Sequence, residues 1–195
     1  MIKYLGSILN LRKMNNEIKP DPDLPERIRV RQIKYSDLPG LEWGGEFTHF
    51  RRVYSDAYKR VLKGLSLIWV AEHPKQGIIG QLFIQLNCDR PELADGVEKA
   101  YMYAFRIRPE YRSHGLGNGM MQIIENDLSQ RGFSILTLNV AKDNPRARAL
   151  YERRGFVITS DEPGIWSYPD DKGIWHQVNE PAWRMEKPLD PLKAS

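Results

Sequence analysis

The order of elements expected over residues 101–158 constrains the fold of this chain more than any other feature. Apolar runs at strand or helix spacing, separated by glycine and proline, predict a strand, a glycine-rich turn, a helix, a strand, a second helix and a third strand. The first strand is expected at residues 101–107, the turn at 113–119 and the first helix from there to residue 130. The second strand is expected at 134–140, the second helix at 145–154 and the third strand at 155–158. Alternating strands and helices of this kind predict an α/β (α+β) fold with a mixed sheet.

The residues before this run predict further strands and one helical region. We expect a first strand over 27–33 and a β-hairpin from two apolar runs, 65–71 and 77–86, which proline and glycine separate. Between them, the segment Ser36-Asp37-Leu38-Pro39 offers N-cap chemistry for a helical region that runs towards Leu62. Aromatic residues recur there on one helical face, as is typical of a core-facing stripe: Trp43, Phe47, Phe50, Tyr54 and Tyr58.

The length of 195 residues suits one domain with a sizeable core. Three prolines between residues 20 and 25 break any helix and mark a linker. We therefore expect an N-terminal extension over 1–26, whose first residues suit a short accessory helix. The domain is expected over 27–187, with a final strand that begins at Ala182, and a C-terminal tail over 188–195.

The net charge of +4 comes from the start of the chain. Residues 1–34 carry eight Lys or Arg against four Asp or Glu, and the rest of the chain is neutral overall. Nucleic-acid binding needs basic residues clustered on one face, and no such run is present, so we expect no nucleic-acid partner. No stretch approaches the roughly 20 apolar residues that span a bilayer, and the single cysteine, Cys88, fits a reducing compartment. We therefore expect a cytoplasmic protein without a membrane partner.

A glycine-containing turn after the strand 101–107 has the features of an anion-binding site. Its residues are Arg112, Ser113, His114, Gly115, Leu116 and Gly117. The turn opens a helix, where exposed N–H groups carry partial positive charge and glycines let a phosphate approach the backbone. The Walker pattern is excluded because Asn118 follows Gly117, and the dinucleotide pattern Gly-x-Gly-x-x-Gly is also absent. A diphosphate is the natural ligand of such a turn.

Together with the segment after the next strand, this turn resembles the cofactor-binding region of the GNAT superfamily of acyl-CoA N-acyltransferases. The family's loop reads Arg/Gln-x-x-Gly-x-Gly/Ala, and its later segment reads Asn-x-x-Ala-x-x-Leu-Tyr-x-x-x-Gly-Phe. The matching residues are Arg112, Gly115, Gly117, Asn144, Ala147, Leu150, Tyr151, Gly155 and Phe156. The resemblance implies a mixed, mostly antiparallel central sheet flanked by helices, with strand splay at the cofactor site. It also implies acetyl transfer from acetyl-CoA to a primary amine by direct attack in a ternary complex.

The resemblance also implies where acetyl-CoA binds. The pantetheine arm is expected beside the strand 101–107, and the pyrophosphate on the backbone amides of 113–118. The implied contacts are Phe105, Arg106, Ile107, Arg112, Ser113, His114, Gly115, Leu116, Gly117, Asn118, Asn144 and Tyr151. The four histidines are dispersed without metal-ligand spacing, so we expect no metal.

Two proton transfers accompany this reaction. Tyr151 matches the family's tyrosine that protonates the departing thiolate, although it also suits simple packing of its helix. Some family members carry a glutamate base where this chain has Tyr101, a phenol with an ordinary pKa of about 10 and a weak base at neutral pH. Glu98 lies nearby in the sequence. The alternatives for the base are Glu46, His49, His176, or water ordered by Tyr101 and Tyr103.

The sequence leaves the acceptor open. Residues 161–180 carry a local net charge of −4 with interleaved aromatic side chains, which suits a cationic small-molecule or peptide amine, or else a solvated turn. The residues expected near the acceptor are Glu42, Glu46, Tyr103, Asn139 and Trp166. Because the common glutamate is missing, a non-catalytic acyl-CoA-binding or regulatory module on the same fold is the alternative. A homodimer is compatible with either function.

Overall fold

The computed structural model describes residues 28–190, so the expected extension 1–26 and most of the expected tail 188–195 lie outside the described residues. The elements in chain order are β1 (Arg29–Gln32), η2 (Tyr35–Gly45), η3 (Thr48–Phe50), α2 (Arg51–Leu62), β2 (Ser66–His73), β3 (Gly77–Gln85), β4 (Lys99–Ile107), η4 (Pro109–Tyr111), α3 (Leu116–Gln130), β5 (Ile135–Ala141), α4 (Pro145–Arg153), β6 (Val157–Glu162), β7 (Ile165–Pro169), β8 (Trp175–Asn179) and β9 (Ala182–Pro188). Within residues 28–190, no helix is both long and apolar enough to cross a bilayer.

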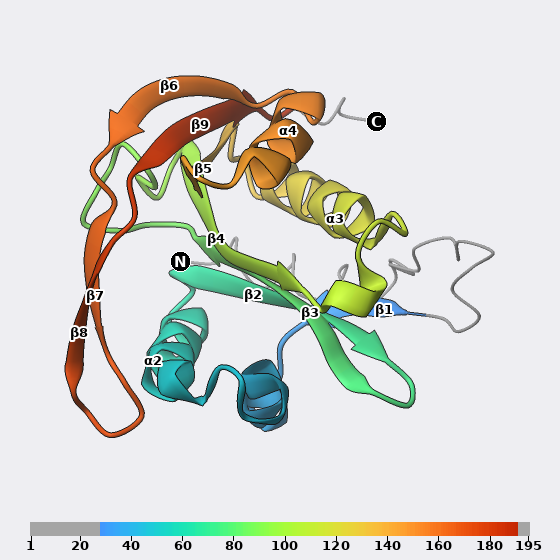
Figure 1. The fold of residues 1–195 in the computed structure, drawn as a ribbon. Helices are drawn as coiled ribbons and strands as arrows, with labels where there is room; N and C mark the ends of the chain where they lie inside the picture. The colour runs from blue at the N-terminus through green and yellow to red at the C-terminus, as the bar shows by residue number, and fades with distance from the viewer. Residues whose placement is uncertain (1–27, 191–195) are drawn as a thin grey trace.

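Seven strands form one mixed sheet in the order β1-β2-β3-β4-β5-β9-β6. β4 and β5 run parallel, whereas the other neighbouring pairs of this sheet run antiparallel. Figure 1 shows α3 and α4 on one side of the sheet and α2 on the other. The expected mixed, mostly antiparallel sheet flanked by helices is therefore confirmed.

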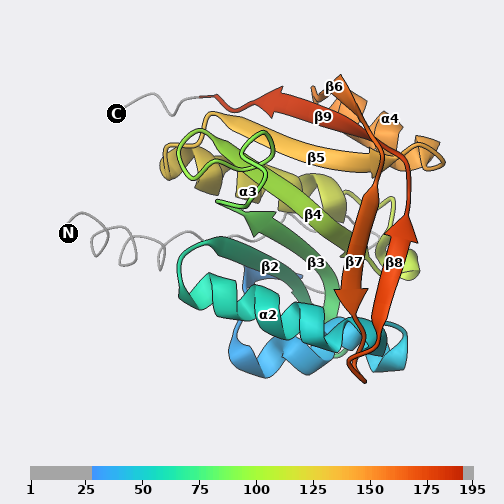
Figure 2. The ribbon, with the colours of Figure 1, turned by 90° about the vertical axis from the view of Figure 1, so that its left-hand side faces the viewer.

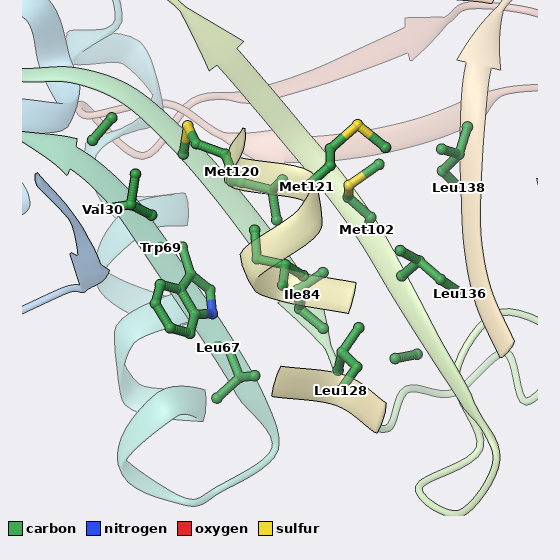
Figure 3. Close-up of a cluster of buried hydrophobic side chains, with 14 of the residues drawn as sticks. Val30, Leu67, Trp69, Ile84, Met102, Met120, Met121, Leu128, Leu136 and Leu138 are labelled. Atoms are coloured by element: carbon green, nitrogen blue, oxygen red, sulfur yellow. The ribbon is translucent and has the colours of Figure 1, made fainter. Parts of the chain in front are cut away.

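The sheet face under α3 forms the larger hydrophobic core. Alternate residues of a strand point to opposite faces, so Leu136 and Leu138 of β5 reach this core together, where they meet Met120 and Met121 of α3. Figure 3 shows this cluster between the helix and the strands. By the same alternation, Asn139 faces the opposite side of the sheet.

The opposite face is covered over β1–β3 by α2 and the 3₁₀ segments before it. The region expected as one helix is broken, because Trp43 and Gly44 have φ values of 48° and 72°. The aromatic stripe nevertheless packs on this face as expected. Trp43 and Tyr54 are buried, and Phe47 and Phe50 pack partly buried against the same core cluster.

The chain enters η2 through an ion-paired cap. The N-cap residue is Lys34, just before the expected segment 36–39, and Asp37 of that segment takes part in the cap by accepting the hydrogen bond of the Lys34 N–H at 2.6 Å. The Asp37 carboxylate also accepts two hydrogen bonds from Arg31 of β1, at 2.6 and 2.9 Å, and Arg31 donates to Glu72 of β2 at 2.8 Å. The hydrogen bond from Arg31 lowers the pKa of Asp37 below its ordinary value.

We expect Asp37→Asn to lower the free energy of unfolding by about 1–2 kcal/mol near neutral pH, because it removes a largely buried partner of Arg31. The folded-state pKa of Asp37 is depressed, so its stabilisation is present above the unfolded pKa of about 4 and is lost as pH falls through the folded pKa. Urea denaturation of both proteins at neutral and at acid pH measures the difference. Asp56→Asn is the control, because its exposed carboxylate pairs with Lys59 on the surface and should change stability little. An Asp37→Asn effect of equal size at both pH values would contradict this account.

An antiparallel hairpin, β7–β8, occupies the segment between β6 and β9. The alternative of a solvated turn for this segment is wrong, because residues 165–179 pair as two strands. β6 and β9 already pair with one another as far as Glu162↔Ala182, so the hairpin projects from the end of the main sheet. Figure 2 shows it crossing from that end towards α2. The face of the sheet opposite α3 thereby gains a cover that periodicity alone did not predict.

Candidate functional site

β4 and β5 separate part-way along their length. Their parallel pairing covers residues 99–102 of β4 and then stops, although β4 continues to Ile107. Beyond this point β4 stays paired with β3 through a bulge, where Ala104 has a φ of 47°. Within residues 28–190, the β5-facing backbone edge of 103–107 therefore has no strand partner. Its N–H and C=O groups are available to an extended ligand.

The predicted anion-binding turn follows this free edge and leads into α3. Its backbone adopts left-handed conformations at Ser113 and Gly115, with φ values of 69° and 78°. The Gly119 N–H donates to the Gly115 carbonyl oxygen at 3.0 Å as the helix begins. The N–H groups of residues 116–118 come earlier in the same turn and have no intrahelical acceptor. They form a ready anion-binding cluster.

Gly117 lets this cluster approach the free edge of β4. A Cβ atom there would lie 3.3 Å from Ile107 Cδ1 and 3.5 Å from Phe105 Cζ. Glycine thus allows the first turn of α3 to pack closely on the strand. One elongated ligand with a diphosphate can therefore reach both the amides of α3 and the edge of β4.

Two arginines flank the turn. Arg112 Nε donates to the Ile107 carbonyl oxygen at 2.8 Å, which ties its guanidinium to the end of β4. Arg146, in the first turn of α4, donates to Ser113 Oγ at 3.0 Å. Arg146 was not predicted as a site residue from the sequence, because residue spacing along the chain does not reveal that α4 begins beside this turn. His114 Nδ1 is buried with no hydrogen-bond partner among residues 28–190. These donors and cations fit the phosphates of CoA.

α4 supplies Asn144 and Tyr151. Asn144 Oδ1 accepts a hydrogen bond from the Ala147 N–H at 3.0 Å, so this side chain caps the helix through its oxygen. Its amide nitrogen is not used in the cap. Tyr151 packs against the larger core, with its ring centroid 5.7 Å from that of Phe156. Burial raises the pKa of Tyr151 to about 12, so its phenol keeps its proton at neutral pH. The residue can therefore donate a proton as well as pack.

Tyr101 and Tyr103 project from β4 towards the face opposite α3. Their rings stack with centroids 5.8 Å apart. Burial raises the pKa of Tyr103 to about 12 and raises the pKa of Tyr101 as well. Both phenols therefore remain protonated, which suits them to order water rather than to accept a proton. Glu98 is exposed before the start of β4, roughly 20 Å of strand away from Phe105. The structure does not bring Glu98 to the site.

The Arg106 side chain lies on the α2 side of the sheet. Its NH1 donates to the Tyr54 hydroxyl at 3.1 Å. Its guanidinium carbon lies 4.3 Å from the ring centroid of Phe47 and 4.9 Å from that of Phe50. Any contact of Arg106 with acetyl-CoA is therefore made by its backbone, because the side chain points away from α3.

Glu42 and Glu46 occupy different environments. Arg51 Nε donates to Glu42 Oε1 at 2.7 Å, and the Thr48 hydroxyl donates to Glu42 Oε2 at 2.8 Å. The bond from Arg51 lowers the pKa of Glu42, which makes this carboxylate a poor base. Glu46 is exposed. Trp166 of β7 is also exposed and packs on Tyr168 of the same hairpin.

The hairpin docks on the start of α2. The Tyr168 ring lies 4.8 Å from Phe50 and 5.3 Å from His176, measured between centroids, and His49 is next to the same rings. His176 Nε2 lies 2.9 Å from the buried Asp170 carboxylate. Two of the alternative bases, His49 and His176, are thus brought to one cluster.

The acidic side chains of 161–180 are largely paired. Lys142 Nζ bonds Asp161 at 2.6 Å, and Arg90 bonds Glu162 at 2.9 Å. Asp170 bonds His176, as described above. This pairing leaves less free negative charge for a cationic acceptor than the sequence suggests.

The profile of the Acetyltransferase (GNAT) family matches residues 30–156. The [Ribosomal protein bS18]-alanine N-acetyltransferase of Escherichia coli strain K12 is 33% identical over 60 residues, which are 31% of this chain and 40% of that protein. The chain thus matches about two fifths of the length of this curated relative.

Solved structures share the fold. The E. coli ribosomal-protein-S18-alanine N-acetyltransferase superposes with a TM-score of 0.62 at 20% identity, covering 84% of this chain and 94% of that one. Arabidopsis thaliana NAA60 in complex with a bisubstrate analogue gives 0.60 at 19% identity, with coverage of 84% and 99%. Spermidine N-acetyltransferase from Vibrio cholerae, in complex with CoA and spermine, gives 0.59 at 18%, with coverage of 84% and 96%. With its strand splay, its amide cluster and a family match over most of the described domain, the chain belongs to the GNAT family of acetyltransferases.

Proposed function

We propose that this chain transfers an acetyl group from acetyl-CoA to a primary amine of a small molecule or peptide. The observation that carries the proposal is the free edge of β4 beside the amide cluster of α3. The activities of similar proteins support an amine as the acetyl acceptor, since these proteins include a ribosomal-protein alanine N-acetyltransferase and a spermidine N-acetyltransferase.

The chain's own groups have separate roles in this proposal. Acetyl-CoA supplies the thioester that the amine attacks. The amides of 116–118, with Arg112 and Arg146, hold the diphosphate. Backbone groups of 103–107 hold the arm, and N–H groups there stabilise negative charge on the thioester oxygen. Tyr151 donates a proton to the departing sulfur.

The amine's proton leaves on the side of Tyr101 and Tyr103. Because both phenols remain protonated, we assign them the ordering of the amine and of water. Among the candidate bases, His49 and His176 lie together on Tyr168 of the hairpin, and we assign them the receipt of the proton through water.

Acetyl transfer is tested with purified protein, acetyl-CoA and a panel of amines and peptides. Release of free CoA thiol and the mass of the acetylated product are both measured, and calorimetry gives the Kd of acetyl-CoA separately. Product formation supports the proposal. Acetyl-CoA binding without transfer to any amine would favour the non-catalytic acyl-CoA-binding module, and no binding would overturn both functions.

Asn118→Asp should weaken acetyl-CoA binding roughly 10-fold, because it adds a negative charge beside the amides proposed to hold the diphosphate. The same change should slightly raise the melting temperature, since an acidic group near a helix N-terminus stabilises the helix by about 0.3–1 kcal/mol. Asn118→Ala is the matched control, because the exposed side chain is removed without added charge. Calorimetry and thermal unfolding give the two readouts. Unchanged affinity in Asn118→Asp would place the diphosphate elsewhere.

A further inference from the structure

Two neighbouring residues on the face of the sheet opposite α3 each carry a buried polar atom without a partner among residues 28–190. Asn139 Oδ1 of β5 and Arg184 Nε of β9 have no hydrogen-bond partner among residues 28–190. The two residues are cross-strand partners in the β5–β9 register. Their chain neighbours Leu138 and Met185 are buried in the core under α3, so both side chains point to the other face.

The ion pair of Arg184 is long. Its NH1 lies 3.5 Å from Glu162 Oε1, and its side chain is 17% exposed. The Glu162 carboxylate is already engaged, because Arg90 NH2 donates to both of its oxygens at 2.9 Å. Glu92 bonds Arg90 at 2.7 Å in the same cluster, so two carboxylates and two guanidinium groups lie together, and Arg184 Nε is the guanidinium donor left without a partner among residues 28–190. A largely buried guanidinium in this setting favours a further oxygen acceptor.

This pair belongs to the acceptor side of the proposed reaction. Asn139 follows Leu138, the residue at which β5 parts from β4. Arg90 and Glu162 lie close enough to Tyr101 to influence its pKa in opposite directions. Asn139 and Arg184 therefore lie on the same face of the sheet as Tyr101 and Tyr103, next to the point where β5 parts from β4.

The two atoms are complementary to one chemical grouping. Asn139 Oδ1 accepts hydrogen bonds and so matches an amine N–H, whereas Arg184 Nε donates and so matches an oxygen. Resting on the proposed acetyl transfer, we propose that Asn139 and Arg184 select an acceptor whose amine carries a carbonyl or carboxylate on the adjacent carbon, the α-amino end of an amino acid or peptide. A polyamine has no oxygen for Arg184 and would place a further cation beside it.

The first test varies the acceptor and leaves the protein intact. Four acceptors are compared by kcat/KM at equal neutral-amine concentration: free alanine, a tetrapeptide beginning with alanine, the same tetrapeptide with its first carbonyl reduced to CH₂, and spermidine. We expect alanine or the tetrapeptide to exceed both the reduced peptide and spermidine about 100-fold, because a site built for a hydrogen bond rejects the analogue that lacks it. If alanine is the better acceptor, Arg184 binds a free carboxylate; if the tetrapeptide is better, Arg184 binds a peptide carbonyl.

The second test varies Arg184. In Arg184→Gln, KM for the preferred acceptor should rise at least about 10-fold, and the preference for the intact over the reduced peptide should fall towards one. The Kd of acetyl-CoA should not change. Arg184→Lys keeps a positive charge and should retain more of the preference for the intact peptide. If thermal unfolding shows that Arg184→Gln is unfolded, Arg184→Lys replaces it as the test variant. Arg90→Gln is the control, because it removes the contacts of Arg90 with Glu162 and Glu92 and leaves Arg184 in place.

Clear outcomes separate this inference from the proposed function. Equal or better transfer to spermidine or the reduced peptide, or an unchanged preference in a folded Arg184→Gln, would overturn the α-amino assignment and leave acetyl transfer standing. Transfer to side-chain amines alone would do the same. Acetyl-CoA binding with no transfer to any amine would overturn acetyl transfer itself.

Discussion

Tyr151→Phe is expected to lower kcat about 100-fold while the Kd of acetyl-CoA stays nearly unchanged. The phenol packs against the larger core through its ring, which phenylalanine keeps, so the fold should survive the change. Only the hydroxyl proton proposed to reach the departing sulfur is lost. Steady-state kinetics with a saturating amine, together with calorimetry of acetyl-CoA, measures both quantities.

The same tyrosine makes a prediction about pH. Burial raises the pKa of Tyr151 to about 12, so its donor form persists well above neutral pH, and kcat should show no alkaline loss from this group below about pH 11. Tyr35→Phe is the matched control, because Tyr35 is exposed on the far 3₁₀ segment. Turnover of Tyr151→Phe equal to that of the unaltered protein would leave Tyr151 with packing alone.

Gly164→Ala is expected to lower the free energy of unfolding by about 3 kcal/mol and to raise KM for the amine. Gly164 has a φ of 66°, and a Cβ atom there would collide with the Glu180 carbonyl group. The backbone at the base of the hairpin must therefore shift, and with it the cover of the proposed acceptor side. The Glu180 N–H, which donates to the Gly164 carbonyl oxygen at 3.0 Å, would move with it.

Gly173→Ala provides the comparison at the other end of the hairpin. Its φ of 88° is equally left-handed, but a Cβ atom would meet only the flexible Arg52 side chain, at 3.5 Å. We expect a cost of about 1 kcal/mol from backbone strain alone. Urea denaturation of both variants and amine kinetics measure the difference. Similar losses in the two variants would mean that the contact with Glu180 is not what constrains the hairpin.

The local part of the site was predictable from the sequence. A helix start with glycines, an arginine before it and a later Asn-Pro helix start are encoded within a few residues of one another. The structure accordingly places Gly115, Gly117 and Asn118 at the start of α3 and Asn144 at the cap of α4. Their contacts with acetyl-CoA remain predictions.

The bulge in β4 explains why the position of Arg106 was harder to predict. Strict alternation from Met102 would point Arg106 to the α3 side. Tyr103 and Ala104 instead both pack on the α2-side cluster, so the faces of the following residues are exchanged. Phe105 then faces α3 and Arg106 faces α2. A single extra residue has this effect, and no feature of the sequence marks it.

The remaining features depend on contacts between distant residues. The hairpin meets η3 through Tyr168 and Phe50, and it meets α2 where Arg52 donates to the Asp171 carbonyl oxygen at 3.3 Å. Charge counting over 161–180 missed the pairing of these acids, because Arg90 and Lys142 lie elsewhere in the chain. Such contacts follow from tertiary packing and not from local patterns.

The way the hairpin is attached has a consequence for how the protein can evolve. Glu162 and Ala182 already close β6 against β9, so everything between them can be exchanged for a short turn or another appendage without interrupting the seven-stranded sheet. Neither the amide cluster of α3 nor the splay of β4 belongs to that segment. A descendant can therefore acquire a different entrance on the proposed acceptor side by one insertion or deletion, while it inherits the proposed acetyl-CoA site unaltered.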